Sequence, residues 1–294
     1  MTADDRASLQ ASRLAVTDAR QLGGRDRLLL ILVAGTLVLL YAPTVRWLLD
    51  RWTMSVWHNG HGLLIPPVVA YYAYQELRDV RHLPASASAW GFVLLGAALL
   101  LHVFDVGMHT QLLSAFSIVV ALPGLSLLFL GPERTRQILV PLAFLLFMLP
   151  IPLGFTEHIH LWLRQLATNA AVSVLPWLGV PAHAEDTVLY MPNSGLLVAD
   201  ACSGFSTLYA AIAIACLAAY TTFGWQRRVL VLALAVPLAV GANILRVALL
   251  GLLVYWRGTY VLETWIHSAS GVLTFALALP PVLWLGSRQP PNTR

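Results

Sequence analysis

Hydrophobic and polar residues alternate along this chain in long blocks rather than in the short periods of a soluble fold. Eight apolar blocks occur, at about 28–44, 62–75, 89–104, 112–130, 138–154, 204–223, 229–255 and 265–285. A bilayer-spanning helix needs about 20 predominantly apolar residues. The pattern therefore predicts an all-α, polytopic helical membrane protein with about eight transmembrane helices. The second block is the shortest, and a re-entrant segment is the alternative there.

Composition supports a membrane protein and argues against a soluble enzyme. Of 294 residues, 58% are hydrophobic and only 11% are charged, whereas a soluble domain has about 25% charged residues. We expect a polar cytoplasmic tail over residues 1–27, one membrane domain over 28–286 and a short C-terminal tail over 287–294. No metal or other cofactor is expected.

The arginines predict how the chain is oriented in the membrane. All 18 basic residues are arginine. If the N-terminus is cytoplasmic and each block crosses once, 13 arginines fall on the inside and 4 on the outside, as the positive-inside rule requires. Their scattered spacing is unlike a nucleic-acid footprint. We therefore expect a multi-pass protein of the cell inner membrane that does not bind nucleic acid.

The longest stretch rich in polar residues lies between the fifth and sixth blocks, at 156–203. Its first part, 156–176, has polar residues at helical spacing and is typical of a helix on the membrane surface. Its second part, 179–192, is bounded by Gly and Pro and rich in Val, Leu and Tyr, which predicts a loop or short hairpin. This stretch is the best place to look for a site.

Three chemically distinct residues are predicted to reach one depth on the outer side. Cys202 stands at the outer start of the sixth helix, and His267 begins the eighth. Arg246 lies about 17 residues into the seventh helix, which rises from the cytoplasm, so it is ~26 Å from the cytoplasmic end of that helix. Asn243 lies three residues earlier, on the same helical face.

Each of these residue types also has a purely structural interpretation. A cysteine in a helix is often a small packing residue, the role expected for Cys216. A histidine at a helix end can cap it or sit at the interface, and an arginine can snorkel to the membrane surface. A guanidinium within an apolar block costs at least ~2.5 kcal/mol, however, so Arg246 is expected to face a partner, water or a substrate. The two cysteines lie ~21 Å apart along one helix and cannot form a disulfide with each other.

An ordered set of motifs resembles one known family, the exosortase and archaeosortase membrane proteins. The set comprises 61–66 (HGLLIP), 149–152 (LPIP), the stretch 179–201 leading to the cysteine, 201–204 (ACSG), 243–246 (NILR), and His267 followed by Gly271. The resemblance covers residue 57 to the end of the last helix. It departs from many relatives at 205–207, where this chain has Phe-Ser-Thr in place of a basic residue.

The resemblance implies a thiol transpeptidase that acts on exported proteins ending in a short motif, a hydrophobic helix and a basic tail. It implies Cys202 as nucleophile, His267 as acid/base and Arg246 as transition-state stabiliser. Asp200, Ser203 and Asn243 are expected to support them. The chemistry is sound on general grounds, because nearby positive charges favour a thiolate and a thiolate that attacks a peptide carbonyl gives a thioester.

Three other readings compete with this one. A serine intramembrane protease would use 268–271 (SASG), but its histidine and serine would then share one helix. A metalloprotease would use His58 and His61, or His158 and His160, but residues two apart in a helix do not face one ligand. These four histidines are interpreted as loop or interfacial residues, with His61 and His183 as further candidates for supporting the site. The third reading is a transporter or assembly factor that binds an anion through Arg246, Asp200 and Glu263.

Overall fold

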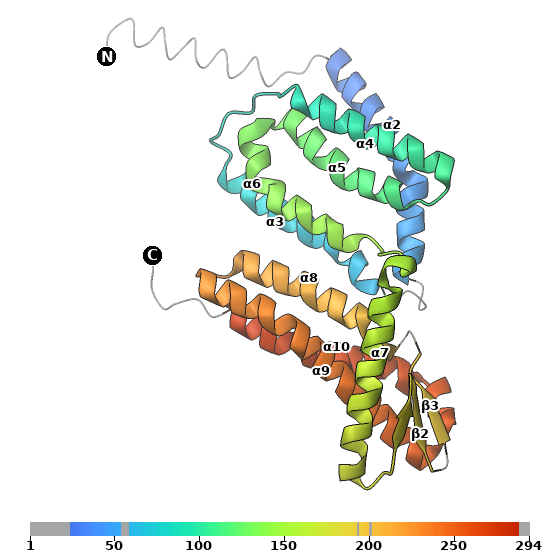
Figure 1. Ribbon diagram of the computed structural model, residues 1–294. Helices are drawn as coiled ribbons and strands as arrows, with labels where there is room; N and C mark the ends of the chain where they lie inside the picture. Colours follow the sequence, from blue (N-terminus) through green and yellow to red (C-terminus); the bar gives the residue numbers. More distant parts are fainter. Residues whose placement is uncertain (1–23, 54–58, 193, 200–201, 288–294) are drawn as a thin grey trace, which may run out of the picture. The chain divides into compact units, whose positions relative to one another are not determined.

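A computed structural model describes residues 24–53, 59–192, 194–199 and 202–287. These residues form nine α-helices and one small sheet (Figure 1). The helices are α2 (Gly24–Thr53), α3 (Ile65–Asp79), α4 (Trp90–Met108), α5 (Leu112–Phe129), α6 (Gly131–Ala143), α7 (Leu153–Val174), α8 (Phe205–Thr221), α9 (Trp225–Arg257) and α10 (Trp265–Ser287). Short 3-10 helices are η1 (Gly60–Leu63), η2 (Phe144–Met148), η3 (Leu175–Leu178) and η5 (Thr259–Glu263).

Five helices in the described part of the chain are long and apolar enough to cross a membrane. They are Ile31–Thr53, Trp90–Met108, Leu112–Phe129, Trp225–Arg257 and Trp265–Gly286. The polytopic all-α architecture predicted from the sequence is confirmed. The shorter blocks form shorter helices: α8 has 17 residues and α3 has 15, less than the usual span of about 20.

Two predictions for residues 138–192 can be compared with the structure directly. The fifth apolar block is not one helix, because α6 ends at Ala143 and η2 continues to Met148. The predicted hairpin is present and is extended by a third strand. Strands β1 (His183–Glu185), β2 (Val188–Met191) and β3 (Ser194–Leu197) form an antiparallel sheet in the order β1-β2-β3.

The chain divides into two compact units, residues 1–47 and 48–294. In the first unit, the described residues belong to α2, whose large apolar side chains are mostly exposed, including Leu39 and Val38. In the second unit α4 pairs with α5, and α8, α9 and α10 pack side by side (Figure 1). The residues discussed below as a site belong to this second unit.

The core beneath the candidate site joins the sheet to α7 and α9. Its fully buried members include Leu175, Leu189, Val198 and Leu250, and Cys202 belongs to the same cluster. Alternation along β3 points Leu196 inward and leaves Leu197 exposed. Val198, which directly follows β3, is therefore packed in the same core as Cys202.

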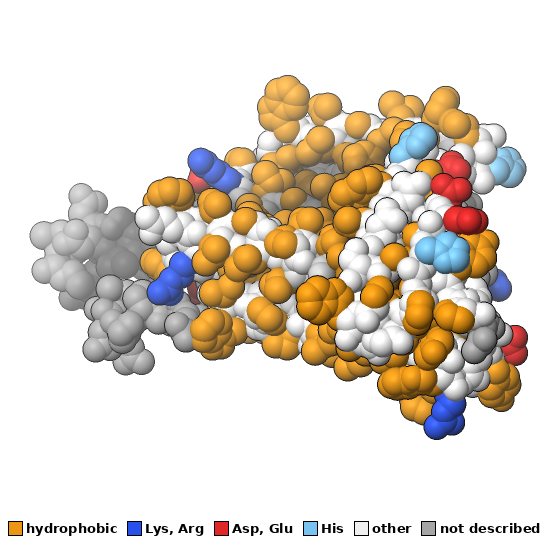
Figure 2. All heavy atoms as spheres, turned by 60° about the horizontal axis from the view of Figure 1, so that its bottom comes forward, with side chains coloured by type: hydrophobic (Ala, Val, Ile, Leu, Met, Phe, Trp, Pro, Cys, Tyr) orange, Lys and Arg blue, Asp and Glu red, His pale blue; other side chains and the backbone are white. Residues whose placement is uncertain are grey.

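Large hydrophobic side chains are exposed on helices throughout the described chain. They include Leu39, Phe92, Leu100, Trp225 and Val272. Figure 2 shows hydrophobic side chains over much of the face in view. A water-soluble protein seldom exposes contiguous apolar patches of more than a few hundred Å², so this surface fits a protein surrounded by lipid.

Candidate active site

The turn that carries Cys202 connects the sheet to α8. The Cys202 amide donates a hydrogen bond to the Ala199 carbonyl at 2.8 Å, and Gly204 caps α8 with a φ of 79°. Only glycine adopts this left-handed conformation without strain. Cys202 thus lies just before the first turn of α8, with 5% of its surface exposed.

Asn243 of α9 ties this turn to the neighbouring helix. Its side-chain amide donates to the carbonyl of Cys202 at 3.2 Å and to the carbonyl of Ser203 at 3.0 Å. The contact is so close that a Cβ added at Gly204 would lie 2.4 Å from Asn243 Cγ. Two buried carbonyls that no helix bond could satisfy are thereby paired, and the turn is held in one position.

His267 lies in the first turn of α10 and faces the cysteine. Its Nε2 atom is 3.8 Å from Cys202 Sγ, within the range for a hydrogen bond to sulfur. The two residues are 65 positions apart in sequence and come from different elements, so only the packing of α8 and α10 brings them together. The pair has the geometry needed for proton exchange between thiol and imidazole.

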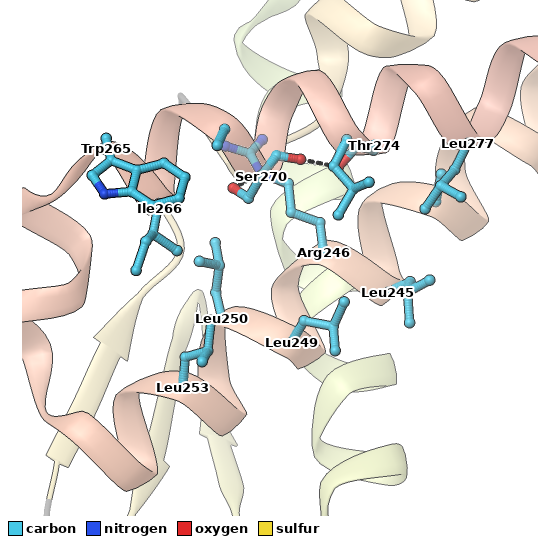
Figure 3. Close-up of a pocket in the computed structure, with 13 residues that line it drawn as sticks. Leu245, Arg246, Leu249, Leu250, Leu253, Trp265, Ile266, Ser270, Thr274 and Leu277 are labelled. Carbon is cyan, nitrogen blue, oxygen red and sulfur yellow. Dashed lines mark hydrogen bonds between the residues drawn. The ribbon is translucent and has the colours of Figure 1, made fainter.

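Arg246 is buried, with 7% of its surface exposed, and is bound to the same turn of α10. Its Nε–H donates to Ser270 Oγ at 2.9 Å (Figure 3). That hydroxyl in turn donates to the His267 carbonyl at 2.6 Å. A guanidinium inside an apolar helix requires polar partners, and Ser270 is one of them. The structure thus brings Cys202, Arg246 and His267 into one region of the fold, and their catalytic roles stay predictions.

The protonation of Cys202 depends on two opposing effects. Burial raises the pKa of the Cys202 thiol above its ordinary value, and the Arg246 charge acts in the opposite direction without cancelling it. Arg246 therefore lowers the pKa of the thiol, as expected from its positive charge, but the pKa as a whole is raised and not lowered. Desolvation is the larger effect, because a buried thiolate loses its hydration.

His160 is a residue that sequence reasoning missed. Its Nδ1 lies 2.9 Å from Ser203 Oγ, and its ring packs on Phe205 with 4.5 Å between centroids. The signal was available in the helical spacing of α7, since His160 shares a face with the buried Leu163 and Ala167. His160 lies within α7 and not in a loop, and it contacts the residue next to Cys202.

The other predicted supporting residues have different positions. Ser203 is 1% exposed, and its Oγ accepts a hydrogen bond from the Phe205 amide at 3.3 Å. His61 packs edge-on against Tyr209, with ring centroids 5.1 Å apart, and burial lowers its pKa. His183 stacks on its cross-strand neighbour Tyr190. Asp200 and His58 lie outside the described residues.

The competing catalytic interpretations find less support in the structure. Ser270 and His267 share α10, and the Ser270 hydroxyl is bonded to the His267 carbonyl rather than to its ring. Within the described ranges, no group of three or more His, Cys, Asp or Glu side chains could hold a metal ion.

Taken together, the fold and this cluster define a polytopic helical membrane protein with a buried cysteine, a buried arginine and a half-buried histidine at one site. The sequence matches the family model described as transmembrane exosortase over residues 52–284. The chain therefore belongs to the transmembrane exosortase family, a family that acts on exported proteins with C-terminal sorting signals. Comparisons with curated proteins and with solved structures give no match.

Proposed function

We propose that this protein is a membrane-embedded cysteine transpeptidase or protease that cleaves the C-terminal sorting signal of exported proteins through a thioester. The observation that supports it most strongly is the 3.8 Å separation of Cys202 Sγ and His267 Nε2. A packing cysteine needs no such partner, whereas a nucleophile needs a base within reach. Family membership supports a protein-sorting role independently.

In the proposed acylation step, the Cys202 proton moves to His267 Nε2 and the thiolate attacks the scissile carbonyl carbon. The C–N bond then breaks, and His267 returns its proton to the departing amine. The products are a thioester on Cys202 and a free C-terminal fragment. Because burial opposes ionisation of the thiol, transfer of the proton to His267 as attack begins is more favourable than a resting thiolate.

Arg246 is proposed to stabilise the negative charge that develops on the carbonyl oxygen. The Nε–H bond to Ser270 fixes the plane of the guanidinium, and a fixed planar fork presents donors without reorganisation. Hydrogen-bond donors that are oriented in advance in a water-poor site give the largest single contribution to the rate enhancement of many acyl-transfer enzymes.

The thioester is then resolved by an incoming nucleophile. An amine yields a new amide and completes transpeptidation, whereas water yields a carboxylate and completes proteolysis. In either case His267 accepts the proton of the nucleophile and returns it to the departing Cys202 sulfur. We infer that the site faces the outside of the inner membrane, where exported substrates arrive. The arginine-rich segments mark the cytoplasmic side, and the site residues are predicted to lie at the other ends of their helices.

The test compares two cysteine variants in cells that express an exported protein with a motif, an apolar helix and a basic tail. Cys202→Ala is expected to abolish processing, seen as loss of the shortened product on a gel. Cys216→Ala is the matched control, because Cys216 lies within α8 away from the turn, and it is expected to process normally. Normal processing by Cys202→Ala at wild-type protein level would instead favour the transporter or assembly-factor reading.

A further inference from the structure

A groove lies between α9 and α10 and includes Arg246 of the candidate site in its wall. It has a volume of about 350 Å³. Its walls are mainly apolar side chains of the two helices, among them Leu245, Leu249, Leu253, Trp265 and Leu277 (Figure 3). Leu273 of α10 also lines it. Ligand pockets start at about 300 Å³, so the groove has room for a few side chains and not for a whole helix.

This groove faces the membrane rather than the interior of the helix bundle. Both helices that form it are candidate membrane spans, and its wall residues Leu249, Trp265 and Leu277 are substantially exposed. Apolar exposure on a membrane span is exposure to lipid. A partner that enters the groove therefore approaches sideways, within the bilayer.

Three polar side chains, those of Arg246, Ser270 and Thr274, distinguish one part of the groove from the rest. Arg246 and Ser270 form part of its wall (Figure 3), and they are bonded to each other and, through Ser270, to the His267 carbonyl. The groove thus reaches Arg246, which is bonded through Ser270 to the backbone of the turn that carries His267. A lipid chain has no acceptor to offer a guanidinium at this depth, whereas a peptide leaving its helix has free backbone carbonyls.

We propose that this groove binds the apolar segment of the substrate at the point where it meets the scissile peptide. Side chains from one ridge of that segment fill the space between Leu249 and Leu273, and the unwound peptide beyond them passes Arg246. Side-chain ridges that fit grooves are the usual mode of helix packing, and packing drives helix association in lipid. This proposal rests on the proposed function and adds the direction from which the substrate enters.

Photocrosslinking within the full-length protein in native membranes tests this assignment. A benzophenone amino acid replaces Leu249 or Leu273 in a Cys202→Ala background, which leaves the substrate uncleaved. Leu283 is the matched control position, because it lies on the same helix as Leu273, is similarly exposed (49% against 52%) and does not line the groove. We expect crosslinks to the substrate's apolar segment from Leu249 and Leu273 at least tenfold above those from Leu283. Crosslinks to lipid alone, or equal crosslinks from all three positions, would overturn the proposal.

A second pair of variants separates failure of this proposal from failure of the proposed function. Leu273→Trp narrows the groove, and Leu283→Trp makes the same change outside it. We expect Leu273→Trp to lower processing at least tenfold while alkylation of Cys202 by iodoacetamide stays at the wild-type rate, and Leu283→Trp to process normally. Equal processing by both variants would refute the proposed role of the groove in substrate binding. Processing by Cys202→Ala would instead refute the proposed cysteine chemistry, and the crosslinking result would not depend on it.

Discussion

The contact between Gly204 and Asn243 gives a quantitative prediction about the turn that presents the nucleophile. Gly204→Ala forces an alanine into a left-handed conformation, which costs about 1–2 kcal/mol. It also places a Cβ 2.4 Å from Asn243 Cγ, and overpacking of this kind costs about 1–3 kcal/mol. Asn243→Ala leaves the carbonyls of Cys202 and Ser203 without their donor, at about 1–3 kcal/mol each.

The double variant is expected to cost less than the sum of the two single variants. Asn243→Ala removes the atoms nearest to the new Cβ, leaving Asn243 Cβ at 2.8 Å as the closest contact. The free-energy changes of contacting residues typically couple by about 0.5–3 kcal/mol. We expect a coupling in that range, with the double variant less destabilised than the sum of the two single variants. Free energies of unfolding in mixed micelles, obtained by titration with SDS, measure it.

The same variants report on the site through the reactivity of its thiol. A Cys216→Ala background leaves Cys202 as the only cysteine, because the sequence has two. Each single variant is expected to change the alkylation rate of Cys202, since the turn moves in both. If the changes in unfolding free energy caused by the two single variants add up in the double variant within about 0.3–0.5 kcal/mol, the close contact between Gly204 and Asn243 described here is refuted.

Three further predictions concern the groups around the thiol. Arg246→Lys is expected to lower the processing rate by about 10²-fold, because an ammonium cannot hold Ser270 and present an oriented donor at once; wild-type rates would exclude the proposed role. His160→Ala is expected to destabilise the fold by about 1–3 kcal/mol by leaving the buried Ser203 hydroxyl without this partner, and His160→Gln to cost less; equal melting temperatures would contradict it. Alkylation of Cys202 is expected to rise with pH into the alkaline range because burial raises its pKa. Arg246→Gln, which removes the charge that lowers this pKa, is expected to move the curve to still higher pH, and an unshifted curve would contradict the assigned electrostatics.

The helical architecture was predictable because lipid imposes a simple rule on the sequence. Backbone groups in a bilayer must be satisfied within each segment, so long apolar blocks become helices, as α4, α5, α9 and α10 show. The block at 138–154 was harder, since Pro141 removes a backbone donor near the end of α6. Helix ends of this kind depend on local geometry that hydropathy does not record.

Part of the site was predictable from topology and part of it was not. Cys202, Arg246 and His267 break the apolar pattern, and their depth follows from a count of residues along each helix. The helical spacing of α7 places His160 on the same face as buried residues, but its bond to Ser203 depends on how α7 packs beside the turn. The Arg246 bond to Ser270 also depends on the angle between α9 and α10.

The most direct test of the central claim is to trap the acyl-enzyme. Purified protein is mixed with its exported substrate, quenched in acid and analysed by peptide mass spectrometry, with and without neutral hydroxylamine. We predict that the peptide containing Cys202 gains the mass of the substrate's acyl fragment and loses it with hydroxylamine, as a thioester does. Processing that proceeds with no adduct on Cys202, or with the adduct on another residue, would contradict the account.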